Sequence, residues 1–340
     1  MENLQEEINR TKIIRNILLE YHGVQLDINK LTNEVTDGVV NKLSNAFAGF
    51  QFDETYNVGQ IFKTDEIVEQ NTKIDNVVVK VDITKTNKFL VDGGLAAEQT
   101  EKKDNGLCNV LLNLEICVND DNFSLLRTKI LSVISHELNH AFKVVEVINK
   151  KSKSLTYNSA VKLTGFGLIT KLKDYPLLQE FLHMFYLSLS DEINARVQQT
   201  YSELQTITSN DYNDTIRQLL QFNPLNDAKK MMHYNVKDIY LLDPNFLNYF
   251  IHEFNNNLEY CAEKDGIELR TKLGINSFFN YWEYVIKGRG IILYHKILRL
   301  VADKHEVSDN ALMKKINKKT LNEITGDAYN IFNRYDEDYH

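Results

Sequence analysis

Hydrophobic residues near the start of the chain recur at intervals of three and four. Over residues 1 to about 48 they include Ile13, Ile17, Val39 and Leu43. This period places apolar side chains on one face of a helix, where they can pack against a core. The pattern therefore predicts two or three helices at the N-terminus.

Further along, the hydrophobic pattern becomes β-branched and partly alternating, which favours strands. Three such runs occupy residues 76–84, 87–94 and 109–118. Two adjacent glycines commonly mark a turn, so Gly93-Gly94 is interpreted as one. We expect a small sheet of about three strands.

Helical spacing then returns and dominates the rest of the chain. A long helix is predicted over residues 122–149, after a stretch of capping-type residues. Beyond residue 208 every clear pattern is helical, most strongly at 243–263 and 277–305. The fold class expected from this order is α+β, mostly helical, with one small sheet and a helical C-terminal region.

The stretch 175–204 has helical spacing throughout, as one helix or as two. Pro176 marks a natural start, because proline is tolerated in the first turn of a helix. Ser188 or Ser190 could cap a second helix.

The length of the chain predicts more than one domain. Its 340 residues exceed the roughly 100–200 that are usual for a single domain. We predict N-terminal helices at 1–50, a catalytic-type domain at 51–207 and a helical C-terminal domain at 208–340.

Composition excludes several classes of partner. Hydrophobic residues make up 43% of the chain and charged residues 25%, which is typical of a globular protein with a substantial core. The net charge of -8, with only short basic clusters, argues against nucleic acid. No apolar run reaches the roughly 20 residues of a membrane span, so we expect no membrane and a soluble protein. Three cysteines without paired spacing suggest a reducing, cytoplasmic location.

The segment VISHELNHAF, residues 133–142, contains the strongest chemical signal. Residues four apart lie on one face of a helix, so His136 and His140 can offer imidazole nitrogens to a single zinc ion. Glu137 lies about 100° around the helix, close enough to take a proton from a zinc-activated water. Together they supply what amide hydrolysis needs.

The same motif has an ordinary explanation, because HExxH arises by chance in about one or two chains per hundred of this length. The apolar stripe of the predicted helix weakens that explanation, since both histidines point roughly 160° away from its centre. The stripe consists of Leu131, Ile134, Leu138, Ala141, Phe142 and Val145. Two solvated histidines on a helix surface remain an alternative.

Residues Val133 to Phe142 match the long form of the zincin signature at every position. The chain therefore resembles zincin-type HExxH zinc metallopeptidases, and is similar to such proteins of bacteria and bacteriophages, over about residues 75–205. The resemblance implies a zincin-like sheet with an active-site helix. It also implies an edge strand upstream that pairs with extended substrate, for which 109–118 is the candidate, and a second helix that carries the third zinc ligand.

A catalytic zinc site needs three protein ligands and one open position. The metzincin pattern would place glycine at 143 and histidine at 146, whereas this chain has Lys143 and Glu146. Without that glycine we expect the helix to continue, which would point Glu146 away from the histidines.

Glu192 is the better candidate, and it makes the chain resemble the gluzincin branch. Small Ala195, three residues later, would let a second helix approach closely. Many gluzincins have an aspartate four residues after the ligand, but here the residue is Arg196. Glu192 could instead form an i,i+4 salt bridge with Arg196. Asp191 and His183 are weaker alternatives as ligands.

These observations predict a zinc-dependent metallopeptidase acting on a peptide or protein substrate. His136, His140 and Glu192 would bind Zn²⁺, and Glu137 would act as the base. The alternative is a structural or assembly component, for example of a phage virion, with a metallopeptidase-like fold and little activity. Its partner would bind the aromatic-rich C-terminal helices around 278–300, and its location would then be the virion. A regulatory peptidase with one partner protein as substrate is a third possibility.

Overall fold

The structure is a computed structural model, and the chain divides into two compact units, Met1–Asn149 and Lys150–His340. The fold is α+β and mostly helical, as predicted. The predicted three-part domain division stays a prediction. The residues that the structure describes are 28–43, 50–61, 74–85, 89–96, 101–102, 107–118, 126–150, 172–265 and 274–307.

The first unit contains a small mixed sheet. Its strands are β1 (Phe50–Asn57), β2 (Ile74–Lys85), β3 (Leu90–Leu95), β4 (Glu101–Lys102) and β5 (Cys108–Val118). The strand order is β1-β2-β5-β3, and β4 also pairs with β5. Strands β2 and β5 run parallel, and the other pairs are antiparallel. The short helix α2 (Val58–Ile61) follows β1.

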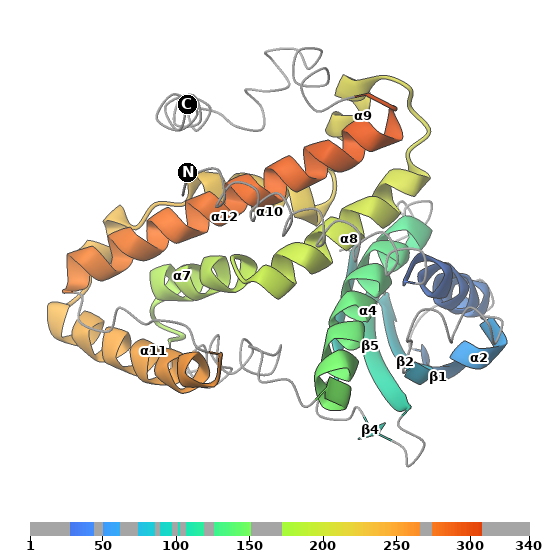
Figure 1. Cartoon of the computed structure of the whole chain (residues 1–340), viewed down its shortest axis with the longest axis horizontal. Helices are drawn as coiled ribbons and strands as arrows, with labels where there is room; N and C mark the ends of the chain where they lie inside the picture. The colour runs from blue at the N-terminus through green and yellow to red at the C-terminus, as the bar shows by residue number, and fades with distance from the viewer. Residues whose placement is uncertain are drawn as a thin grey trace, which may run out of the picture. The chain divides into compact units, whose positions relative to one another are not determined.

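The two faces of this sheet differ in polarity because side chains alternate along each strand. Val79 and Val81 on β2, with Leu112 and Leu114 on β5, belong to the buried face. The residues between them are polar and exposed, as at Lys80 on β2. Helix α4 (Leu126–Lys150) and a helix over 28–43 complete the described part of the unit (Figure 1).

Three expectations for this unit need correction. The sheet has more strands than expected, because β1 and the two-residue β4 were not predicted. Gly93 and Gly94 lie within β3 and form no turn. The stretch 109–118 is not an edge strand, since β5 pairs with β2 on one side and with β3 and β4 on the other.

The second unit is helical throughout its described residues. Its elements are α7 (Pro176–Leu187), α8 (Ser190–Thr206), α9 (Tyr212–Leu219), α10 (Asn223–His233), η3 (Lys237–Leu241), α11 (Pro244–Asp265) and α12 (Ile275–Lys304). Aromatic rings from α7, α11 and α12 pack edge to face in its core, as in the pairs Phe181–Phe250 and Phe254–Phe278. Close approach of α12 to α10 requires Gly290, because a Cβ there would lie 2.7 Å from that of Met231.

Several helix boundaries agree with the sequence. Helix α4 ends at Lys150, and the stretch 175–204 forms two helices. Neither Ser188 nor Ser190 caps the second one, because the N-cap of α8 is Leu189. Pro176 occupies the first turn of α7, as expected. Of the predicted N-terminal helices, the part that contains Val39 is helical, whereas Ile13 lies outside the described residues.

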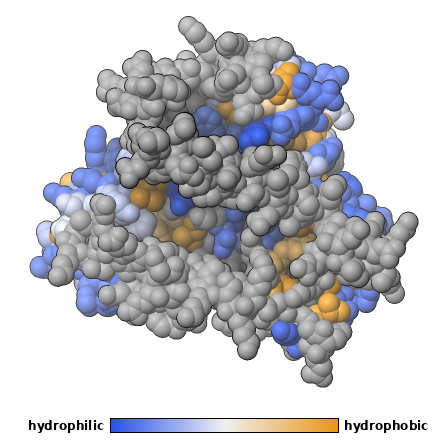
Figure 2. Space-filling model, in the orientation of Figure 1, coloured by the Kyte–Doolittle hydropathy of each residue, from blue (hydrophilic) through white to orange (hydrophobic). Residues whose placement is uncertain are grey.

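Within the described ranges, no helix is both long enough and apolar enough to cross a membrane. In Figure 2, hydrophobic residues appear as several separate patches among hydrophilic ones. Of the C-terminal aromatic residues, Phe278 and Phe279 are buried in the core, whereas Tyr284 is 60% exposed.

Candidate metal centre

One turn of α4 carries His136, Glu137 and His140, and all three side chains are buried. Their exposed fractions are 7%, 6% and 1%. The alternative of two solvated surface histidines is therefore wrong. The apolar stripe of α4 is buried as well, as at Ile134 and Leu138. Helix α4 is thus buried on its apolar stripe and at this polar turn, and buried polar groups cost free energy unless they have partners.

The two imidazoles face each other at the distance that one metal ion would require. The Nε2 atoms of His136 and His140 lie 3.1 Å apart, and the rings meet at 81°. Two nitrogens that each bind a tetrahedral zinc at about 2.0–2.1 Å lie about 3.3 Å apart. The pair therefore fits a shared ion without a change of helix geometry.

Glu137 is held by the backbone of the sheet. Its Oε2 accepts a hydrogen bond of 2.8 Å from the amide of Leu95, at the end of β3. Its other oxygen, Oε1, lies 3.9 Å from Nε2 of His136. Oε2 is thus fixed by the Leu95 amide, and Oε1 is directed toward the imidazole of His136.

The anchor exists because of the way β3 is paired. The amide of Ala96 donates to the carbonyl of Leu111 on β5, at 2.9 Å. Amides alternate in direction along an antiparallel strand, so the Leu95 amide points away from β5. Among the described strands β3 lies at the edge of the sheet, and this outward amide is the one that Glu137 accepts.

Gly93 allows α4 to lie close enough for that hydrogen bond. A Cβ at residue 93 would lie 2.5 Å from Cγ1 of Val133 and 2.9 Å from Cδ2 of Leu114. A Cβ at the next residue, Gly94, would meet nothing within 4 Å. Val133, the first residue of the zincin-like signature, therefore packs where β3 has no side chain.

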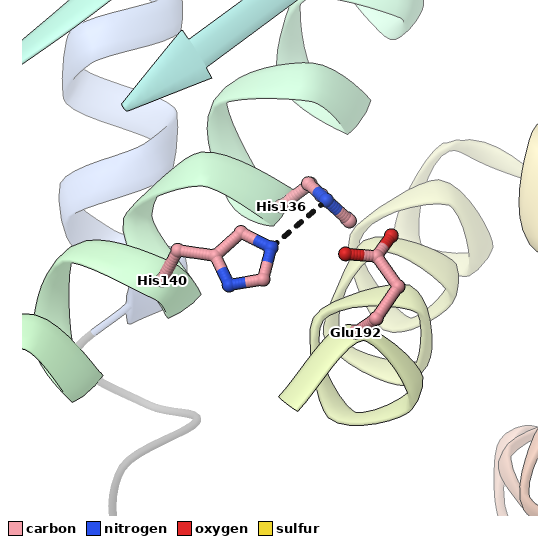
Figure 3. Close-up of side chains that lie close together, drawn as sticks. All are labelled: His136, His140 and Glu192. Carbon is pink, nitrogen blue, oxygen red and sulfur yellow. Dashed lines mark hydrogen bonds between the residues drawn. The ribbon is translucent and has the colours of Figure 1, made fainter. Parts of the chain in front are cut away.

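Glu192 belongs to the same group as the two histidines. It lies in the first turn of α8 and is 1% exposed. Ligand-type atoms of His136, His140 and Glu192 all lie within 4.8 Å of one another (Figure 3). In the part of the chain that the structure describes, no other group of three such residues is this close. Two imidazoles and a carboxylate are a donor set that zinc uses in catalytic sites.

The salt-bridge alternative for Glu192 is also present. The Nε atom of Arg196 lies 2.9 Å from Oε1 of Glu192 and 3.3 Å from Oδ2 of Asp227. A carboxylate has two oxygens, so contact with an arginine and with a metal can coexist. The two interpretations of Glu192 do not exclude each other.

The other candidates fall outside this group. Neither Asp191 nor His183 belongs to it, and the side chain of His183 is exposed. Helix α4 continues through residue 146, as expected without a glycine at 143. Sequence reasoning missed the Leu95 amide and Asp227, because an outward amide and a partner from another helix leave no local signal.

Comparison with family models, curated proteins and solved structures gives no match. The resemblance to metallopeptidases therefore stays a prediction. The structure supports a coarser statement, that a buried His-His-Glu group could hold a metal ion.

Proposed function

We propose that the chain is a zinc-dependent metallopeptidase, in which His136, His140 and Glu192 hold the metal and Glu137 is the general base. The buried His-His-Glu group carries this proposal. A zinc ion bound there would act as a Lewis acid and lower the pKa of a water molecule to near neutrality.

Glu137 has the arrangement that a general base needs. The hydrogen bond from Leu95 fixes Oε2 and so sets the orientation of the carboxylate. If a metal were bound, Oε1, which lies 3.9 Å from Nε2 of His136, would be the oxygen to accept the proton of the attacking water. Burial of the side chain keeps bulk water from competing for that oxygen.

We assign substrate pairing to β3, in place of the interior strand β5. Its outward backbone groups, at Leu95 and at alternate residues before it, lie along an edge of the described sheet. An extended peptide can add to such an edge through main-chain hydrogen bonds. Two amides on this side already donate within the chain, that of Gly93 to Oδ1 of Asp92 at 2.9 Å and that of Leu95 to Oε2 of Glu137 at 2.8 Å. The carbonyls on this side are the groups that would pair.

Elemental analysis of purified protein tests the metal site. We expect about one zinc per chain in the wild type, and loss of that zinc in Glu192→Ala. Asp191→Ala is the matched control, because it removes the neighbouring carboxylate, which lies outside the group. A wild type that takes up no zinc after incubation with the metal would overturn the proposal and favour the structural-component alternative.

Cleavage of a mixed peptide library by the zinc-loaded protein tests the reaction. We expect hydrolysis that a chelator abolishes and added zinc restores. A zinc-loaded protein that cleaves neither peptides nor unfolded proteins would contradict a general peptidase. Activity against one folded partner would then be the remaining form of the proposal.

A further inference from the structure

A buried ionic network surrounds Glu192 within the second unit. Arg196, one turn later on α8, contacts Glu192 and also Asp227 of α10. The exposed fractions of the three side chains are 1% for Glu192, 15% for Arg196 and 9% for Asp227. Nη1 of Arg196 also donates to Oε1 of Gln199, at 3.2 Å. The guanidinium therefore contacts three side chains, two of them through Nε and the third through Nη1.

The charges of this network are arranged around one arginine. A buried carboxylate needs a counter-charge, and Arg196 supplies it to Glu192. Asp227 is a second carboxylate beside the same guanidinium. With both carboxylates ionised, the three side chains together carry one negative charge. Burial raises the pKa of Asp227, and Arg196 acts against that rise. Lys230 contributes little to this network, because its Nζ lies 3.9 Å from Oδ1 of Asp227 and its side chain is 62% exposed.

The geometry also restricts how Glu192 can turn. Arg196 Nε lies beside Oε1 of Glu192 and cannot move far, because Asp227 and Gln199 hold the same guanidinium. A carboxylate with one oxygen fixed presents the other in a defined direction. Residues that orient a metal ligand in this way commonly change metal affinity when they are removed.

We propose that Arg196, held in place by Asp227, is a positioning residue of the metal centre. It orients Glu192 through one carboxylate oxygen and leaves the other to the metal. The arginine stands at residue 196, where the gluzincin-like pattern would have put an aspartate. This inference rests on the proposed function only in that a metal must bind to Glu192.

Zinc affinity, measured by competition with a chromophoric chelator on the full chain, tests this role. We expect Arg196→Met to weaken zinc binding by about 10–100-fold. Arg196→Lys should recover part of the loss, because it restores the charge. Lys287→Met is the matched control: it removes another i,i+4 ion pair of the same unit, with Glu283 on α12, and should bind zinc as the wild type does.

The absorption spectrum of the Co²⁺-substituted protein separates positioning from a general effect on folding. A Glu192 that turns differently changes the ligand field, so Arg196→Met should alter the visible bands and Lys287→Met should not. If Arg196→Met does not fold, Asp227→Asn serves instead, since it keeps the side-chain volume and frees the guanidinium. We expect weaker zinc binding and altered bands there too.

Two failures are distinguishable. A wild type that binds neither zinc nor Co²⁺ would overturn the proposed function. A wild type that binds zinc through Glu192, with unchanged affinity and spectrum in a folded Arg196→Met or Asp227→Asn variant, would overturn only the positioning role of Arg196.

Discussion

The chain places acidic residues in two contrasting settings. On the polar face of the sheet, Asp82 on β2, Glu115 on β5 and Asp92 on β3 are aligned by strand register, and all three are exposed. They line an open hollow, where Gln51 donates to Asp82 at 3.0 Å. Glu137 and Glu192 are instead buried carboxylates on helices.

The difference shows what distinguishes a site from a charged surface. Water solvates and screens the exposed row, so it costs little and needs no partner. A buried carboxylate is expensive, and it persists only where specific donors or ions compensate it. Glu137 has the Leu95 amide, and Glu192 has Arg196 and the two nearby histidines. Burial with arranged partners, and not the number of charges, marks the candidate centre.

The largest expected effect is on the buried base. Glu137→Gln keeps the size of the side chain and removes the proton acceptor, so peptide hydrolysis should fall by about 10²–10⁴-fold. Zinc content should stay at the wild-type level, because Glu137 is outside the ligand group. Steady-state cleavage and elemental analysis on the same preparation check this. Normal cleavage by the variant would show that another group is the base.

A smaller effect is expected from the backbone donor of that base. Leu95→Pro removes the amide that holds Glu137, and this amide points away from β5, where an edge strand tolerates proline. A hydrogen bond to a charged group is worth about 1.5–3 kcal/mol, so hydrolysis should fall by roughly 10–100-fold with zinc retained. Leu95→Val is the control, since it keeps the amide. Equal kinetics in both variants would count against the anchor.

The two adjacent glycines of β3 offer a matched comparison of stability. Gly93→Ala would force its Cβ against Val133, and overpacking of this kind costs about 1–3 kcal/mol in the free energy of unfolding. The Cβ of Gly94→Ala would have no atom within 4 Å, so its free energy of unfolding should stay within about 0.5 kcal/mol of the wild-type value. Urea denaturation measures both. Adding Val133→Ala to the first variant should restore part of the loss, and no recovery would contradict the close-packing account.

The smallest effect is expected on the exposed row. Glu115→Gln removes a charge that lies between Asp82 and Asp92 in register. Like charges opposite one another in a sheet are destabilising, so the variant should be more stable by about 0.2–1 kcal/mol. Zinc content and cleavage should not change. A loss of either would show that the polar face of the sheet takes part in function.

The local parts of the centre could be predicted from the sequence. The 3.6-residue period places His136, Glu137 and His140 on one helix, and the resemblance to gluzincins singles out Glu192, which lies near both histidines in the structure. The prediction that 109–118 is an edge strand was wrong, because the position of a strand just before the motif in the sequence does not reveal its neighbours in the sheet. Strand β1 was missed because its eight residues, Phe50–Asn57, are mostly polar or aromatic and carry no β-branched run. Asp227 could not be found, since it reaches Arg196 only through the packing of α10 on α8.

The break between α7 and α8 has an electrostatic consequence. Because α7 ends at Leu187 and α8 begins again at Ser190, Glu192 lies in a first helical turn and not in mid-helix. The peptide dipoles of α8 therefore direct partial positive charge toward this carboxylate, a contribution of about 0.3–1 kcal/mol. A two-residue interruption in an otherwise helical stretch thus helps to hold a negative charge in the protein interior.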